Sequence, residues 1–285
     1  MNGDLKIPNS ACWNITSRCN DTCAFCYREL NSQELSFDNQ KKVIDKIAEV
    51  GIKKLTFTGG EPLLLEKINN LILYAKCKGI MASLTTNAIL LENNKTECGF
   101  LFENLDWLTL SLDGADDRVQ SQMGRNAEHA KRVKQILTYA NEYPKRKCKL
   151  KINTVVSKLN KDDLIYLADI VKEYKIDRWK LFQFTPVRGK AVDSKKIYNI
   201  TDQDFNDVAN NIKVRLAGER IILSICGRTN IESAHFVIFP DGDIRISNDC
   251  KDRVVGNILK DDIIGIWCNG CFFKELHEQR TGFIS

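Results

Sequence analysis

No run of apolar residues in this sequence approaches the ~20 positions that a helix needs to cross a bilayer. The N-terminal segment Met1–Pro8 also lacks the basic region followed by an apolar stretch that marks a secretion signal. The short segment before Cys19 leaves no room for an amphipathic helix lying on a membrane. We therefore expect a cytoplasmic protein with no membrane partner.

Internal repeats, low-complexity segments and Pro/Gly-rich linkers are absent as well, which excludes repeat proteins and flexibly linked modules. The net charge is only +5, from 42 basic and 37 acidic residues, and no basic stripe is interleaved with aromatic residues. This balance argues against a nucleic-acid partner and is compatible with a small anionic ligand. Eleven cysteines without a secretion signal indicate thiolates that bind metal rather than disulfides.

A closely spaced group of cysteines follows the first strand-like run. The sequence Cys19-Asn-Asp-Thr-Cys23-Ala-Phe-Cys26 places three thiolates where they can hold three irons of a four-iron–four-sulfur (4Fe-4S) cluster. The fourth iron would lack a protein ligand, so we expect a catalytic site rather than a structural one. The alternative is a zinc site or buried free thiols, but zinc prefers four ligands in paired Cys-x-x-Cys units, and no matching pair lies nearby.

Strand-like and helix-like segments alternate over most of the chain, and Val43, Ile44 and Ile47 show the helical spacing. The strand-like runs are Ala11–Thr16, Lys54–Thr58, Met81–Thr85, Trp107–Leu112, Leu150–Val156 and Trp179–Phe184. The helix-like runs are Phe37–Val50, Glu66–Cys77, Ala127–Tyr143, Lys161–Tyr174 and Thr201–Ala217. Such alternation predicts an α/β fold with a parallel sheet and helices outside it.

The pattern changes after about residue 218, where Ile221–Ile225 and His235–Phe239 are strand-like and Ile263–Glu278 is helix-like. We expect residues 1–9 to form an N-terminal tail, residues 10–217 the main fold, and residues 218–285 an extension packed on it.

The cysteine spacing, with Phe25 before the third cysteine, resembles the signature of the radical S-adenosylmethionine (SAM) superfamily. The resemblance implies a partial (β/α)6 barrel with a small C-terminal α+β extension. It also implies a 4Fe-4S cluster on Cys19, Cys23 and Cys26 whose open iron binds SAM and cleaves it to a 5′-deoxyadenosyl radical. The implied SAM residues are Phe25, Tyr27, Thr58, Gly59, Gly60, Glu61, Asn87, Ser111, Asp113 and Arg125.

Each of these assignments has a chemical reason. In Thr58-Gly59-Gly60-Glu61-Pro62 the glycines permit close backbone approach, and Glu61 is the expected partner of the SAM ammonium. Ser111 and Asp113 fall where the superfamily contacts the SAM ribose. Arg125 could form a bidentate contact with the SAM carboxylate, or it could be an exposed loop residue.

Polar residues recur at every second position of several strand-like runs, so they share one face of each strand. These residues are Lys54, Thr56 and Thr58, then Lys151 and Asn153, then Arg178 and Lys180. If the apolar alternates face the surrounding helices, four cations line the lumen, where only an anion such as a triphosphate would stabilise them. The alternative is that the cations lie at strand entrances, exposed to water.

The segments Lys-Ile-Asn-Thr-Val-Val and Arg-Trp-Lys-Leu-Phe-Gln, with Thr86-Asn87, resemble the viperin family of radical SAM enzymes. The resemblance covers roughly residues 10–184 and implies dehydration of a ribonucleoside triphosphate (CTP, UTP or GTP) to its 3′-deoxy-3′,4′-didehydro form. The product is a chain terminator in antiviral, here phage, defence. The implied substrate residues are Lys54, Asn87, Lys151, Asn153, Arg178 and Lys180.

In the implied mechanism the radical takes the C4′ hydrogen and the 3′-hydroxyl leaves as water with proton help. Lys54 and Asn153 are candidate catalytic residues. The tyrosine that animal viperins place near the leaving hydroxyl is missing here, so His235 is a candidate proton donor, although a lone histidine is more often structural. The expected partners are the nucleotide and an electron donor such as flavodoxin or ferredoxin, and we expect a monomer.

The C-terminal cysteines Cys226, Cys250, Cys268 and Cys271 leave a second function open. Radical SAM enzymes that modify peptides bind auxiliary clusters in such extensions. However, Ser247 stands where a cysteine usually follows the turn, and Cys268 and Cys271 fall in the helix expected at Ile263–Glu278.

Overall fold

The computed structural model describes residues 7–30, 32–228, 234–248 and 251–281. They form two compact units, each built from separate stretches of the chain. The first unit contains residues up to Cys19, Arg28–Leu84 and the chain from Thr229 onward. The second contains Asn20–Tyr27 and Thr85–Arg228. The chain therefore passes from one unit to the other between Cys19 and Asn20, within the cysteine motif.

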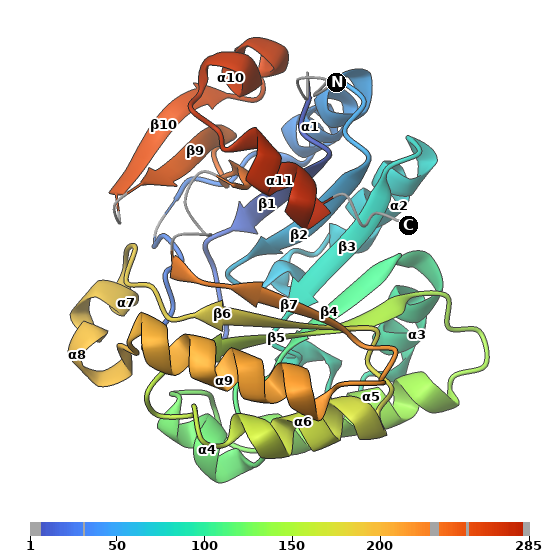
Figure 1. Ribbon diagram of the computed structural model, residues 1–285. Helices are drawn as coiled ribbons and strands as arrows, with labels where there is room; N and C mark the ends of the chain where they lie inside the picture. Colours follow the sequence, from blue (N-terminus) through green and yellow to red (C-terminus); the bar gives the residue numbers. More distant parts are fainter. Residues whose placement is uncertain (1–6, 31, 229–233, 249–250, 282–285) are drawn as a thin grey trace. The chain divides into compact units, whose positions relative to one another are not determined.

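The first unit has a mixed sheet in the order β10-β9-β8-β1-β2-β3 (Figure 1). β8, β1, β2 and β3 are parallel, and β9 and β10 continue the sheet as antiparallel strands. The strands are β1 Ser10–Thr16, β2 Lys54–Gly59, β3 Met81–Thr86, β8 Phe236–Ile238, β9 Asp243–Asn248 and β10 Lys251–Asn257. The helices are α1 Phe37–Glu49, α2 Ile68–Cys77, α10 Ile263–Asn269 and α11 Lys274–Thr281, with a 3-10 turn η1 at Pro62–Leu64.

The second unit has a fully parallel sheet in the order β4-β5-β6-β7. Its strands are β4 Trp107–Ser111, β5 Lys149–Val156, β6 Arg178–Gln183 and β7 Ile222–Cys226. The longer helices are α3 Lys95–Asn104, α5 His129–Glu142, α6 Leu164–Glu173 and α9 Asp202–Arg215. The short ones are η2 Ile89–Leu91, α4 Asp117–Gln122, α7 Lys190–Asp193 and α8 Lys195–Tyr198.

The helices begin and bury one face for ordinary sequence reasons. Ser36 caps α1 by accepting a hydrogen bond from the Asn39 amide, and Val43, Ile44 and Ile47 are fully buried on one side of the helix. Thr201 caps α9 in the same way through the Asp204 amide. In the second unit, α5, α6 and α9 lie on the same side of β4–β7 (Figure 1).

Strands β5 and β6 alternate between buried apolar and half-buried polar side chains, as the sequence predicts. Ile152, Trp179 and Leu181 are fully buried, whereas Asn153 and Lys180 are half-buried on the other face. The same alternation holds in β2 of the first unit, where Leu55 and Phe57 are buried. A period of two in strand burial fixes which face carries the polar groups.

The structure corrects the prediction of one closing helix at Ile263–Glu278. Helix α10 ends at Asn269 and α11 begins at Lys274, because Cys271 has a left-handed φ of 61° between them. Cys268 and Cys271 therefore do not share a helix. The sequence patterns also missed α3, α4, α7, α8 and β10. Among the described residues, no helix combines the length and apolar character that a membrane span requires.

Candidate active site

The cysteine loop of the second unit, Asn20–Tyr27, is fixed by apolar packing and by backbone hydrogen bonds. Cys23 and Phe25 are buried in a cluster with Met123, Phe184, Ala191 and Tyr198. The rings of Phe25 and Tyr198 meet edge-on at 5.8 Å. These contacts fix the backbone of the loop.

The segment of short helices α7 and α8 forms two hydrogen bonds with the backbone of the same loop. The Ala191 amide donates to the Cys26 carbonyl at 3.2 Å, and the Ser194 hydroxyl donates to the Ala24 carbonyl at 2.8 Å. Sequence analysis missed this segment because its helices are only four residues long and carry no clear periodicity.

A buried guanidinium connects the cysteine loop to strand β4. Arg125 donates from Nε to Asp113 Oδ2 at 2.8 Å, and its Nη1 lies 3.7 Å from Asp21 Oδ2 and 3.4 Å from Cys23 Sγ. Burial opposes the charged form, but the carboxylates of Asp113 and Asp21 outweigh it, so the pKa of Arg125 is raised. Arg125 is therefore a permanent cation beside a predicted cluster ligand, and not an exposed loop residue.

Asp113 is fully buried, and both of its carboxylate oxygens have partners. Oδ2 accepts from Arg125, and Oδ1 accepts from the Val155 amide at 2.7 Å. The Asp113 carbonyl accepts from Asn160 Nδ2 at 2.7 Å. These bonds connect the end of β4 with β5, and they position Arg125. The sequence did not identify Asp21 or Asn160: Asp21 occupies a variable position of the cysteine motif, and Asn160 belongs to no motif.

His129 lies behind this network and was also missed. Its Nε2 is 2.8 Å from the Ser111 carbonyl oxygen, and it is fully buried at the start of α5. Desolvation, followed by the charge of Arg125, lowers the pKa of His129 to about 4. The imidazole is therefore neutral at physiological pH.

The Gly59-Gly60-Glu61 turn of the first unit lies against the backbone that leads to Cys19. A Cβ on Gly60 would be 1.9 Å from the Arg18 carbonyl oxygen, and one on Gly59 would be 2.4 Å from that of Thr16. The amides of Gly60 and Glu61 donate to the same two carbonyls, at 2.7 and 2.8 Å. The glycines thus serve this close backbone approach. Glu61 is fully buried and caps η1 through the Leu63 amide.

Further contacts in the first unit secure both sides of the cysteine motif. Glu34 accepts from the Thr16 hydroxyl and from Arg18 Nε, the latter at 3.0 Å. Arg245 on β9 forms an ion pair with Glu29 at 2.8 Å. The segments immediately before Cys19 and after Tyr27 are therefore tied to the first unit.

The predicted substrate residues of β5 and β6 lie side by side in register. Lys151 is opposite Arg178, and Asn153 is opposite Lys180. On the other side of β5, Thr109 is opposite Lys151, and Ser111 is opposite Asn153. We call this set on β4–β6 the polar face; Thr109 is buried, and the other members are half-buried. Its members share one side of the sheet because they occupy alternate positions in paired strands.

Two atoms of the polar face are buried and, within the residues that the structure describes, have no hydrogen-bond partner: Asn153 Oδ1 and Arg178 Nε. Burial lowers the pKa of Arg178, and no charged neighbour offsets this effect. Arg178 is the first residue of β6, and it is half-buried there rather than exposed. Buried polar atoms without partners are costly in a folded protein, which makes them candidates for ligand contact.

The other predicted residues have these positions. Asn87 donates to Asn20 Oδ1 at 2.8 Å and accepts from the Ile89 amide. Tyr27 is exposed, with the Arg188 guanidinium 5.5 Å from its ring centre. In the first unit, Lys54 and Thr58 are half-buried on the same face of β2, and His235 is half-buried just before β8.

Cys23 and Cys26 share one turn, in which the Cys26 amide donates to the Cys23 carbonyl at 3.2 Å. Burial raises the pKa of the Cys23 thiol to about 12, while Arg125 favours its thiolate. Among the described residues, no three His, Cys, Asp or Glu side chains are close enough to hold a metal ion. The donor chemistry fits an iron–sulfur cluster, since an adjacent cation stabilises a thiolate ligand, and the three-cysteine site stays a prediction.

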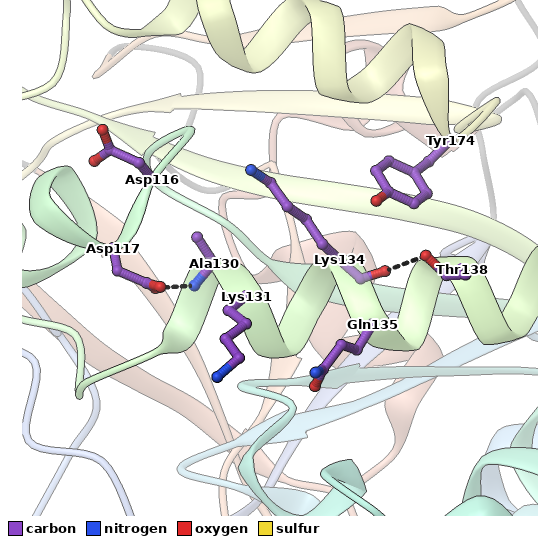
Figure 2. Close-up of a pocket in the computed structure, with 8 residues that line it drawn as sticks. All are labelled: Asp116, Asp117, Ala130, Lys131, Lys134, Gln135, Thr138 and Tyr174. Carbon is purple, nitrogen blue, oxygen red and sulfur yellow. Dashed lines mark hydrogen bonds between the residues drawn. The ribbon is translucent and has the colours of Figure 1, made fainter.

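A surface pocket of about 350 Å³ lies elsewhere in the second unit, along α5 (Figure 2). Polar side chains such as Asp116, Lys131 and Lys134 line it, and the Asp117 carboxylate accepts from the Ala130 amide there. The pocket contains none of the predicted site residues.

Comparison with known proteins identifies the superfamily of this chain. Residues 13–171, which are more than half of the chain, match the radical SAM superfamily. The chain belongs to the radical SAM superfamily. Streptococcus suis SuiB bound to precursor peptide SuiA has a TM-score of 0.76 at 19% identity, over 96% of this chain and 67% of SuiB. That likeness concerns the fold alone and confirms the predicted α/β fold class, typical of the radical SAM partial barrel with a C-terminal antiparallel extension.

Curated relatives define the family more closely. The chain is 34% identical over 225 residues to an S-adenosylmethionine-dependent nucleotide dehydratase of Flammeovirga pacifica, with 74% of each chain covered. It is 28% identical over 278 residues to a protein of the same name from Selenomonas ruminantium, covering 95% of this chain and 96% of the relative. Within the superfamily the chain is thus a member of the viperin-like family.

The close approach at Gly60 gives a first prediction. In Gly60→Ala the new methyl group would overlap the Arg18 carbonyl, so the turn must move away from the segment preceding Cys19. We expect a loss of stability of roughly 1–3 kcal/mol and less iron bound per chain after anaerobic reconstitution. Gly227→Ala is the control, because its Cβ would have no neighbour closer than 3.6 Å. Equal iron content and stability in the two variants would contradict the prediction.

His129 gives a second prediction, on the pH dependence of folding. The pKa of His129 is 6.5 in the unfolded chain and about 4 in the folded chain. Stability that is present above pH 6.5 is therefore lost as the pH falls. We expect the free energy of unfolding of the apoprotein to fall by about 2 kcal/mol more between pH 7 and pH 5 than that of the His129→Gln variant. Urea titrations at both pH values measure this difference, and parallel curves for the two proteins would refute it.

Proposed function

We propose that this protein is a radical SAM nucleotide dehydratase that converts CTP, UTP or GTP to its 3′-deoxy-3′,4′-didehydro analogue, and that it acts in defence against phages. The observation that supports this most directly is the polar face. On this face two cations, Lys151 and Arg178, lie opposite each other on β5 and β6. In the next row the amide of Asn153 lies opposite Lys180. Phosphate oxygens and sugar hydroxyls are the complementary groups. The two relatives described above are both named nucleotide dehydratases.

Contacts within the second unit alone suggest which end of the nucleotide would point toward the cysteine loop. The Val155 amide, two residues beyond Asn153 on β5, binds Asp113, and Asp113 binds Arg125, which contacts Cys23. Asn153 is therefore nearer to the cysteine loop along β5 than Lys151 is. A ribose beside Asn153 and a phosphate tail beside Lys151 and Arg178 would bring the sugar toward the cysteine loop.

A bound cluster with SAM would supply the radical that removes the C4′ hydrogen. Cys19, Cys23 and Cys26 would hold the cluster, and Arg125 would hold a carboxylate of SAM. The residues of the polar face orient the sugar, because a radical must meet one carbon and not its neighbour. Lys54 and His235 are proposed to assist the departing 3′-hydroxyl, and an electron donor such as flavodoxin or ferredoxin is the expected protein partner.

The proposal predicts a specific product. Anaerobic incubation with SAM, a reductant and each nucleoside triphosphate should yield 5′-deoxyadenosine and a triphosphate lighter by one water, detected by mass spectrometry. The control is the Cys23→Ala protein, which should form neither. If no triphosphate stimulates 5′-deoxyadenosine formation, the protein is not a dehydratase of these nucleotides.

The same samples test the second function that the sequence left open, a peptide-modifying enzyme with an auxiliary cluster. Cys226 is buried at the end of β7, Cys268 and Cys271 are exposed, and Cys250 lies outside the described residues. A dehydratase with a single cluster should hold four irons per chain. More than four irons would favour the peptide-modifying enzyme.

A further prediction concerns the cations of the polar face. Arg178→Ala and Lys180→Ala should each raise the KM for the triphosphate about tenfold or more, since a hydrogen bond to a charged group contributes roughly 1.5–3 kcal/mol. Arg215→Ala is the control, because this arginine forms an ion pair with Asp169 on the helix side of the unit. An unchanged KM in both polar-face variants would place these residues outside the nucleotide site.

A further inference from the structure

The polar face continues beyond Lys151 and Arg178, toward the amino ends of the strands. The next position on the same side of β5 is Lys149, and Trp107 lies opposite it on β4. Successive rows on one face of a strand are about 6.7 Å apart. Sequence analysis did not assign either residue to the site. We call Trp107 and Lys149 the outer row.

Trp107 holds two cations at once. Lys149 Nζ is 5.4 Å from the centre of the Trp107 ring, and Arg178 Cζ is 5.2 Å from it. Trp107 itself is 6% exposed, so the indole is a fixed platform, whereas Lys149 reaches solvent. A cation–π contact positions a cation without cancelling its charge.

The Asp177 carboxylate, next to Arg178 in the chain, accepts from the Leu150 amide at 2.7 Å rather than from either cation. Within the part of the chain that the structure describes, neither Lys149 nor Arg178 forms an ion pair, and Arg178 Nε is buried without a hydrogen-bond partner. Two cations held against one ring repel each other, and an anion bound between them would remove that repulsion. The outer row therefore has the chemistry of an anion site.

We propose that the outer row binds the terminal phosphate of the nucleotide, so that Lys149, positioned by Trp107, distinguishes triphosphates from diphosphates. This inference rests on the proposed function. The order of residues on β5 supports it. Asn153 is two residues from Val155, whose amide binds Asp113, Lys151 is four residues from it, and Lys149 is the farthest of the three from the cysteine loop. A phosphate tail that points away from that loop meets Lys149 last.

The test compares binding of CTP, UTP and GTP with binding of their diphosphates, measured calorimetrically on the reconstituted protein with SAM. Lys149→Gln should weaken triphosphate binding about tenfold, which corresponds to about 1.4 kcal/mol, and should change diphosphate binding less than twofold. Lys149→Arg should restore the preference. Lys147→Gln is the matched control, because Lys147 is also exposed and lies two positions earlier, outside the strand. It should bind both nucleotides as the wild type does.

Trp107→Leu tests the platform separately. It should reduce the triphosphate preference in the same direction as Lys149→Gln, and urea titration shows whether the variant remains folded. The inference is overturned if Lys149→Gln binds triphosphates like the wild type, or weakens triphosphates and diphosphates equally. If the wild type binds none of these nucleotides, the proposed function itself fails, and the two failures are thereby distinguished.

Discussion

The buried contact between Arg125 and Asp113 organises the candidate active site. It joins the end of β4 to the loop after α4, and through Asp21 and Cys23 it reaches the cysteine loop. Both side chains of the pair are almost entirely removed from water. Removing one member of such a pair leaves an uncompensated buried charge, which commonly costs about 3–5 kcal/mol. The stability of the fold therefore depends on the same pair that holds a cation beside the thiol of Cys23.

The cysteine motif is fixed by two separate sets of contacts. In the first unit, the amides of Gly60 and Glu61 bind the carbonyls of Thr16 and Arg18, and the Glu34 carboxylate binds the side chains of the same two residues. In the second unit, Ala191 and Ser194 hold the backbone of Ala24 and Cys26. Backbone carbonyls are bound in both units, and the packing of Phe25 against Tyr198 adds a side-chain contact in the second. The Cys23 thiol itself lies between the Asp21 carboxylate, 3.2 Å away, and the Arg125 guanidinium, 3.4 Å away.

The polar face has the opposite character, because it contains groups that the fold leaves without partners. Among the described residues, Arg178 is partly desolvated without forming an ion pair, and the buried oxygen of Asn153 has no donor. Local rules of stability are violated most often at functional sites, where a ligand completes the missing contacts. A bound nucleotide would do so here, which is why we expect it to stabilise the protein as well as to react.

The sequence by itself predicted much of this molecule. The alternation of Ile152 with Asn153, and of Trp179 with Lys180, was sufficient to separate a helix-covered face from a polar one, because side chains alternate strictly along a strand. The cysteine spacing and the segment around Gly59-Gly60 were sufficient to indicate the superfamily. Only the tertiary structure revealed Asp21, His129 and Tyr198, since their roles depend on neighbours far away in the sequence and no local period marks them. The pairing of Lys149 with Trp107 likewise required the strand register, which is set by packing between strands that the chain order alone does not specify.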